Sequence, residues 1–335
     1  MLRVWIPGIA HEGTAKRLVL YSAFAFSAIV ALPLTGKPRT IWAMSPNYFC
    51  MIPALVCRIV SRSKVIHDVV DIWPEALVAT GYKFPKGLLR LVDFFSKVAY
   101  TLSDTIITLS ASMKEVLQKT VPFSKQVIVV ENSVKSDFFR VGAKPGGTPF
   151  HIMYLGTLSP SNDFPTLLDA ASKLQHERGV RFSIVGSGEQ AEQIWRLLRE
   201  KKLSNVDFRE GPVSHNDVTK HLAEADAMVL PLRAGFGDTS FPSKFGEYLA
   251  TGRPVVCMTD GSLARIIATN EIGLIVQPWD SAGLVQAIES LQKDEDQRSE
   301  LGALGRKFAE MNFSELSFRM KVHKILDLAQ SPVRA

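Results

Sequence analysis

Along the chain, short runs of apolar and β-branched residues alternate with longer stretches in which apolar residues recur at helical spacing. In the first part of the chain the short runs predict strands over Val4–Ile9, Thr40–Met44, Lys64–Val70, Thr105–Leu109 and Gln126–Val130. The stretches between them predict helices over Tyr48–Val60, Lys86–Thr101 and Ser110–Thr120. This alternation is typical of parallel α/β layers.

A turn-rich segment, Gly142–Thr148, separates this series from a second one. The second series predicts strands over Phe150–Leu155, Arg181–Val185, Val206–Glu210, Ala227–Leu230, Pro254–Met258 and Gly273–Val276, with a last helix over Phe313–Ala329. We therefore expect two Rossmann-like domains whose parallel sheets face a central ligand cleft. The expected limits are 1–140 for an acceptor-side domain, 141–312 for a nucleotide-sugar domain, and 313–335 for a helix that crosses back to the first.

The first domain looks incomplete at its start. A doubly wound half usually opens with a strand, a glycine-rich turn and a helix. Here Val4–Ile9 is the only early strand, and no glycine-rich turn follows it. The expectation is an N-terminally shortened domain, through either a late start codon or a reduced version of the fold.

Charge and composition indicate which partners and which cellular compartment to expect for the protein. Residues 1–140 hold 17 Lys and Arg against 9 Asp and Glu, so this part carries all the excess of a chain with net charge +6. Anionic lipid explains such a bias, and nucleic acid is not expected because interleaved exposed aromatic residues and known modules are missing. Three scattered cysteines indicate neither a disulfide framework nor a thiolate metal site, and favour a reducing cytoplasm.

One segment, Leu18–Leu34, is apolar enough to raise the question of a membrane. It is short for a span, which needs roughly 20 residues, and no signal-peptide cleavage site closes it. A buried helix that also touches the bilayer is the preferred interpretation. Membrane immersion and a signal sequence are the alternatives.

The strongest chemical signal is the stretch Phe241–Val256. Pro242 suits the first turn of a helix, where free N–H groups at Ser243 and the neighbouring Lys244 make a site for a diphosphate. Glu247 lies one turn further along, and its carboxylate is suited to the diol of a ribose. A plain capped helix with Lys244 and Glu247 as a surface pair is the alternative. The glycine-bearing loop Arg233–Thr239 just before it favours the ligand site.

This stretch resembles the nucleotide-binding segment of the family-4 retaining glycosyltransferases, and its Pro-Ser-Lys form is similar to the branch that includes fucosamine transferases for bacterial surface polysaccharides. The branch has a signature Asp-Leu-Trp-Pro-Glu, which His67–Glu75 resembles. Further similarity lies in Tyr154–Thr157, Ile184–Glu189 and Ala223–Pro231. The resemblance covers nearly the whole chain except the family's N-terminal start.

The resemblance implies the GT-B fold and transfer of a sugar from a UDP-sugar to a polyprenyl-diphosphate-linked acceptor, with retention and without a metal or other cofactor. It implies a protein that is peripheral on the inner face of the cytoplasmic membrane and works in O-antigen, capsule or exopolysaccharide synthesis. It also implies roles for single residues. Asp71, Lys244 and Glu247 are the catalytic candidates, and donor contacts are expected from Gly156, Thr157, Gly188, Gly211, Pro212, Val213, Arg233, Thr239, Ser243, Lys244, Phe245 and Glu247.

Departures from the family pattern keep alternatives open. Many relatives have an acidic residue where Thr239 stands, and a pair of cations in the loop that here reads Thr157–Asp163. The family's His-Asp pair is Val70-Asp71 here, and Asp71 has an alternative role as a helix cap. His67 lies in a predicted strand, where packing is the more common role of a lone histidine. A UDP-sugar 2-epimerase and a catalytically inactive relative remain alternative functions.

Overall fold

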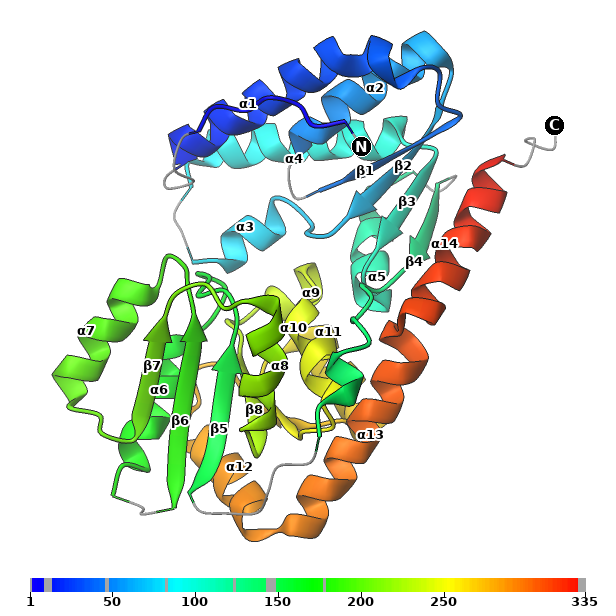
Figure 1. Cartoon of the computed structure of the whole chain (residues 1–335). Coiled ribbons are helices and arrows are strands. Elements are labelled where there is room, and N and C mark those ends of the chain that lie inside the picture. The colour runs from blue at the N-terminus through cyan, green and yellow to red at the C-terminus, as the bar shows by residue number, and fades with distance from the viewer. Residues whose placement is uncertain are drawn as a thin grey trace. The chain divides into compact units, whose positions relative to one another are not determined.

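The structure is a computed structural model, and it describes residues 2–8, 14–45, 48–81, 84–122, 125–142, 149–176 and 179–330. The chain forms two compact units (Figure 1). The first unit comprises Met1–Ala76, Lys83–Glu131 and Arg319–Ala335, and the second comprises Leu77–Tyr82 and Asn132–Phe318.

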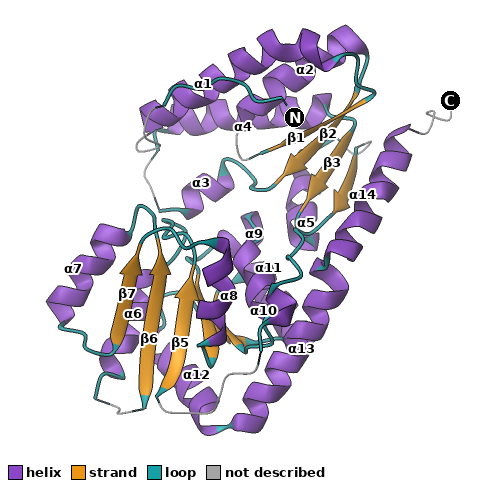
Figure 2. Cartoon of the chain, in the orientation of Figure 1, coloured by secondary structure: helices purple, strands orange, loops and turns teal. Residues whose placement is uncertain are grey.

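The first unit contains a four-stranded parallel sheet of order β1-β2-β3-β4 (Figure 2). Helices α1 and α2 pack on each other, α2 and α4 contact β2, and α5 contacts β3 and β4. Its elements are α1 (Thr14–Ala31), η1 (Leu32–Thr35), β1 (Thr40–Met44), η2 (Tyr48–Cys50), α2 (Met51–Ser61), β2 (Lys64–Val69), α3 (Glu75–Ala79, which continues into the second unit), α4 (Lys86–Leu102), β3 (Thr105–Thr108), α5 (Ala111–Thr120), β4 (Gln126–Val129) and most of α14 (Glu315–Gln330).

The second unit contains a six-stranded parallel sheet of order β10-β9-β8-β5-β6-β7. Its β5 is buried at every position, and alternate residues face opposite sides of the sheet, so that Phe150, Ile152 and Tyr154 join a core cluster with α6, α7 and α12. The elements are η3 (Phe138–Arg140), β5 (Phe150–Leu155), α6 (Phe164–Lys173), β6 (Val180–Gly186), α7 (Ala191–Lys201), β7 (Val206–Glu210), α8 (His215–Ala223), β8 (Ala227–Pro231), α9 (Phe236–Thr239), α10 (Ser243–Ala250), β9 (Val255–Met258), α11 (Gly261–Asn270), β10 (Leu274–Val276), α12 (Ser281–Lys293) and α13 (Glu295–Phe313).

The strands predicted after residue 40 are present with limits that shift by at most a residue or so. The strand predicted over Val4–Ile9 is wrong for the residues that the structure describes there, because Leu2–Gly8 pair with no strand. A strand needs a hydrogen-bonded neighbour, and β propensity alone does not supply one.

The chain passes from the first unit to the second between Glu131 and Asn132, before the expected limit at residue 140. Residues 132–140 belong to the second unit because they pack on its other elements. Val134 forms a bridge with Ser314 and donates its N–H to the Phe313 carbonyl at 2.7 Å, and Phe138 is buried. The linker predicted at Gly142–Thr148 lies outside the described residues except for Gly142.

The apolar segment Leu18–Leu34 forms most of α1 and the start of η1. Leu20 and Ala25 are buried, whereas Phe26 and Val30 are exposed. In the described part of the chain, no helix has the length and apolar character that crossing a membrane requires.

Candidate functional site

The candidate site begins at the N-terminus of α10. The helix starts at Ser243 directly after Pro242, and the Phe245 N–H already donates to the Pro242 carbonyl at 3.0 Å. Lys244 Nζ lies 2.9 Å from Glu247 Oε2, and about a quarter of each side chain is exposed. The two charged groups therefore form a partly buried pair at the positive end of a helix.

Tyr248 fixes α10 against the end of β5. Its hydroxyl donates to the Leu155 carbonyl at 2.9 Å and accepts the Leu155 N–H at 3.0 Å. Burial raises the pKa of this tyrosine well above its usual value, so the hydroxyl stays protonated and keeps both roles. The first turn of α10 is consequently held beside the turn that follows β5.

That turn begins with Gly156, and Lys244 lies against it. A Cβ added at Gly156 would lie 2.6 Å from Lys244 Cε and 3.2 Å from Cδ. Any larger residue at position 156 would require the lysine side chain to move away from the turn. The structure thus places Lys244 beside both Gly156 and Glu247.

Glycines at the carboxyl ends of β6 and β7 lie next to the turn after β5, at the same edge of the sheet. A Cβ at Gly186 would lie 1.8 Å from the Gly156 carbonyl oxygen, and Gly211 donates its N–H to the Gly186 carbonyl at 2.9 Å. The strands β5, β6 and β7 are neighbours, so their carboxyl-end turns meet. Pro212 is exposed and Val213 is half-buried beside this turn. Open backbone at the carboxyl edge of a parallel sheet is where ligands bind in open α/β folds.

Gly188 and Thr157 support the turn with their backbones. A Cβ at Gly188 would lie 2.6 Å from the Leu158 carbonyl oxygen. The Thr157 carbonyl accepts the Tyr154 hydroxyl at 2.6 Å and Asn162 Nδ2 at 3.2 Å. These contacts give Gly188 and Thr157 a packing role whether or not a ligand touches them.

Arg233 extends from the end of β8, the neighbour of β5. Its N–H donates to the Ser161 carbonyl at 2.9 Å, and its Nε lies 3.4 Å from the Asn162 carbonyl oxygen. A Cβ at Gly81 would lie 2.8 Å from Arg233 Nη1. The Arg233 side chain therefore lies beside the segment that follows β5.

Thr239 and its acidic neighbour serve local structure. The Thr239 hydroxyl donates to the Gly235 carbonyl at 3.3 Å within α9. Asp238 Oδ1 accepts the Ser262 N–H at 2.8 Å and also the Ser262 hydroxyl, at the start of α11. Both Oδ1 contacts of Asp238 are therefore made with the first turn of α11.

Phe245 and Ser243 differ in whether they are accessible to a ligand, since Phe245 is buried and Ser243 is exposed. The Phe245 side chain is fully buried and packs edge-on against Phe241 with ring centroids 6.0 Å apart. Its expected donor contact is not available from the side chain, because the apolar face of α10 must point into the core. Ser243 is exposed at the first position of the helix, where its N–H has no partner within the helix.

The remaining catalytic candidate, Asp71, follows β2 in the first unit. It is half-buried, and its carbonyl accepts the Tyr48 hydroxyl at 3.4 Å. His67 in β2 is fully buried between Tyr48 and Tyr100, and burial lowers its pKa to about 3. Packing is therefore the role of His67 in this structure.

Sequence reasoning missed Tyr248, which positions α10, and Asp238, which caps α11. The available signal for Tyr248 was its place one turn after Lys244 on the apolar face of the same helix. Among the described residues, no group of His, Cys, Asp and Glu side chains is arranged to hold a metal ion.

The two parallel sheets define the GT-B architecture, and solved structures share it. Sucrose-phosphate synthase from Thermosynechococcus elongatus matches with a TM-score of 0.80 and 17% identity, over 98% of this chain and 82% of that one. HepE from Anabaena, solved in complex with UDP, matches with a TM-score of 0.71 and 15% identity, over 90% of this chain and 82% of that one. The α/β fold with two parallel sheets is thus confirmed.

The second unit contains the segment that matches a known family model. Residues 149–294 match the family model described as "Glycosyl transferases group 1", and this segment contains the whole candidate site around Lys244. An uncharacterised glycosyltransferase of Methanocaldococcus jannaschii is 26% identical over 235 residues, which are 70% of this chain and 62% of that protein. The chain spans less than two thirds of the length of this curated relative.

Proposed function

We propose that this protein is a retaining, metal-independent glycosyltransferase that moves a sugar from a UDP-sugar to a lipid-linked saccharide acceptor in bacterial surface polysaccharide synthesis. The observation that carries the proposal is the pairing of Lys244 with Glu247 at the start of α10, against the glycine turn after β5. The match of residues 149–294 to group 1 glycosyltransferases supports it, as does the binding of UDP by the structurally similar HepE.

In this proposal, Lys244 and the first N–H groups of α10 stabilise the leaving diphosphate. Breaking the bond between the sugar and UDP develops negative charge on the phosphate and positive charge on the sugar ring. A fixed cation and a helix N-terminus stabilise that charge without reorganising during the reaction. Tyr248 contributes by positioning, since it ties α10 to the Leu155 backbone.

Glu247 has the right form to hold the ribose. One carboxylate oxygen, Oε2, accepts from Lys244 at 2.9 Å. The other oxygen remains available for a ribose hydroxyl, and the three N–H donors of Lys244 allow it to contact a phosphate while it holds Glu247. The ion pair therefore orders both side chains for the donor.

The other contacts with the UDP-sugar are proposed for residues at the carboxyl edge of the sheet in the second unit. Gly211, Pro212 and Val213 provide backbone for the uracil, and Arg233 provides a second cation for the diphosphate in place of the cations missing from Thr157–Asp163. A guanidinium suits a phosphate because its donors form a planar fork.

The acceptor proposed near Asp71 is polyprenyl-diphosphate-linked, and the resemblance of His67–Glu75 to the fucosamine-transferase branch supports it. Such an acceptor lies in a membrane. We expect a peripheral contact with the inner face of the cytoplasmic membrane through the first unit.

Helix α4 is the part of the first unit best suited to that contact. Phe94 and Phe95 are 59% and 56% exposed, and their rings lie 5.7 Å apart. Lys86, Arg90 and Lys97 are exposed on the same helix. Exposed aromatic residues with flanking cations are typical of helices that lie in the interface of an anionic bilayer.

Binding of UDP to the whole chain tests the donor site. Lys244→Met should weaken UDP binding by roughly 1.5–3 kcal/mol, the range for a hydrogen bond to a charged group. Glu247→Gln should also weaken it. Lys220→Met is the matched control, because Lys220 forms an ion pair of the same helical spacing with Asp217 in the same unit. Equal UDP affinity in all three variants would refute the assignment.

Product analysis then separates the classes of function. A transferase should move sugar to an added polyprenyl-diphosphate saccharide, with retained anomeric configuration and in the presence of EDTA. Conversion of the UDP-sugar without an acceptor would instead identify a 2-epimerase, and UDP binding without either reaction would identify an inactive relative.

Vesicle binding tests the membrane contact. Vesicles with anionic lipid should bind the protein at low salt, and binding should fall as salt rises to physiological strength. Phe94→Ser should weaken it further, whereas Trp195→Ser, which alters an exposed aromatic residue of the second unit, should not. Binding that ignores lipid charge would contradict this contact.

A further inference from the structure

Helix α7 of the second unit carries an exposed tryptophan between two exposed charged residues. Glu192, Trp195 and Arg199 follow one another at helical spacing, so they lie on one face of the helix. Together with Glu210 of β7 they line a pocket of about 520 Å³, which we call the α7 pocket. β7 is the last strand in the order of this sheet, and Figure 1 shows α7 beside it.

Trp195 is fixed in position although 42% of it is exposed. Its ring packs on Phe208 with centroids 4.8 Å apart, and its Nε1 donates to Glu210 Oε2 at 2.7 Å. Phe208 and Glu210 are alternate residues of β7, so their side chains leave the strand on the same side and meet the same indole. An aromatic ring held in this way loses little conformational freedom when a ligand stacks on its exposed part.

The charged groups around the ring have free hydrogen-bonding capacity. The ion pairs of α7 involve other side chains, and within the described part of the chain Glu192 and Arg199 have no side-chain partner. Glu210 bonds to Trp195 through one carboxylate oxygen, which leaves the other for a ligand. The pocket therefore offers two carboxylates that accept hydrogen bonds and one guanidinium that donates them.

This combination restricts the chemistry of a ligand. A purely apolar molecule would remove water from the charged groups and give them no hydrogen bond. The two carboxylates repel a phosphate or another anion, and the guanidinium repels a cation. A pyranose ring is neutral, and it has a face of C–H groups that fits an indole. Its hydroxyls both donate and accept hydrogen bonds, so they suit carboxylates and a guanidinium alike.

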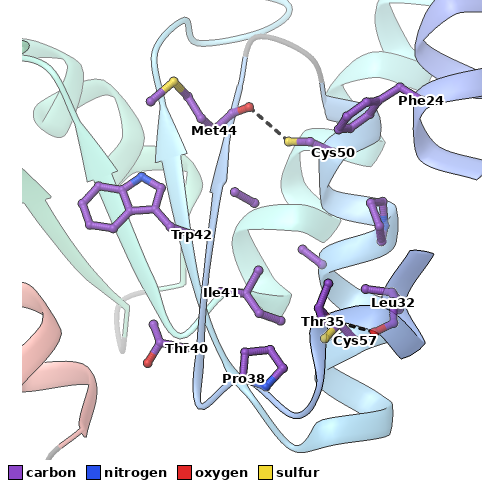
Figure 3. Close-up of a pocket in the computed structure, with 13 residues that line it drawn as sticks. Phe24, Leu32, Thr35, Pro38, Thr40, Ile41, Trp42, Met44, Cys50 and Cys57 are labelled. Carbon is purple, nitrogen blue, oxygen red and sulfur yellow. Dashed lines mark hydrogen bonds between the residues drawn. The ribbon is translucent and has the colours of Figure 1, made fainter. Parts of the chain in front are cut away.

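The pocket beside β1 in the first unit provides a contrast. It has a volume of about 460 Å³, and Trp42 is among the residues that line it. Figure 3 shows Trp42 and Ile41 on opposite sides of β1. No charged side chain is among the described residues that line this pocket. A molecule rich in hydroxyls would therefore find no charged partner there, and the combination of tryptophan, carboxylates and guanidinium distinguishes the α7 pocket.

We propose that the α7 pocket binds a saccharide chain through one of its pyranose units. The C–H face of that unit lies on Trp195, and its hydroxyls bond to Glu192, Glu210 and Arg199. None of these residues belongs to the proposed donor site, so the α7 pocket binds saccharide with or without UDP.

The test uses the whole chain and trisaccharides of glucose, mannose, galactose and N-acetylglucosamine. Trp195→Ala removes the stacking surface. Trp279→Ala is the matched control, because Trp279 is 67% exposed in the same unit and does not line the α7 pocket. Glu192→Gln removes a charge and keeps a group that bonds to hydroxyls. Circular dichroism and UDP binding serve as controls for folding of each variant.

At least one trisaccharide should bind to the wild type. Trp195→Ala should weaken that binding about tenfold, as expected for loss of an aromatic surface, and Trp279→Ala should leave it within about twofold. Glu192→Gln should weaken it by less than about tenfold, because the amide still bonds to a hydroxyl. Saturation-transfer NMR should show the sugar C–H protons against the protein, and Trp195→Ala should remove this signal. Saturating UDP should leave the affinity unchanged.

Different results would overturn the proposal. These are binding of no trisaccharide in the set, equal affinity for the wild type and Trp195→Ala, or displacement of the sugar by UDP. Tetramethylammonium tests the alternative of a cation site, since aromatic rings with carboxylates also bind such ions. If it binds, Glu192→Gln abolishes this binding and no trisaccharide binds, the pocket is a cation site. Saccharide binding by a wild type that fails to bind UDP would refute the donor site and leave the α7 pocket in place.

Discussion

Substitution of Gly156 by alanine tests the donor site without removing any charged group. A Cβ at this position would lie 2.6 Å from Lys244 Cε, whereas carbon atoms in contact are normally about 3.5–4.0 Å apart. The lysine side chain must therefore move by roughly 1 Å away from the turn. The backbone at Gly156 does not have positive φ, so alanine fits it without strain.

The expected effects on stability and on binding differ. The moving atoms are the flexible end of a lysine, so the free energy of unfolding should fall by less than about 1 kcal/mol. UDP affinity should fall by about 1–2 kcal/mol, a part of the value of a charged hydrogen bond, because Lys244 no longer rests against the turn. Isothermal titration with UDP and urea unfolding of the same variant measure the two quantities.

Gly186→Ala provides the contrast. Its Cβ would lie 1.8 Å from the backbone oxygen of Gly156, and its φ is +154°. Backbone atoms cannot move aside as a lysine end can, so this variant should lose several kcal/mol of stability, as expected for strain at a special backbone position. The reasoning about the lysine position is refuted if Gly156→Ala keeps full UDP affinity while Lys244→Met loses it.

Two further predictions concern Tyr248 and His67. Tyr248→Phe leaves the buried Leu155 N–H and C=O without their partner, so unfolding free energy should fall by roughly 2–4 kcal/mol and UDP affinity should fall with it; an unchanged urea midpoint would contradict the anchoring role. The pKa of His67 is about 3 in the fold against 6.5 for the free side chain, so the unfolded chain takes up the proton first and stability is lost as pH falls from 6.5 toward 3. Between pH 7 and 5 the loss should be about 2 kcal/mol in urea unfolding, and His67→Leu should remove it while the exposed control His176→Gln should not. Burial raises the pKa of Asp68 above its usual 3.8, so the folded chain takes up this proton first and Asp68 adds stability as pH falls toward 3.8. This effect is opposite to that of His67, and the comparison of His67→Leu with the wild type separates the two contributions.

The sequence alone determined the order of the elements and most strand limits. Buried parallel strands are apolar on both faces, so they read as short continuous runs such as Phe150–Leu155, and this local property survives in any tertiary context. The pairing of Lys244 with Glu247 was also visible, since helical spacing places these residues on one face.

Tertiary structure decided the rest because the contacts concerned join distant parts of the chain. The Tyr248 hydroxyl reaches Leu155 across 93 positions, and the place of Lys244 beside Gly156 depends on that contact. The strand predicted over Val4–Ile9 is absent from the described residues Leu2–Gly8, because a strand requires a hydrogen-bonded partner that local propensity does not specify. Spacing along the chain predicts which residues share an element, whereas the packing of elements determines which side chains meet.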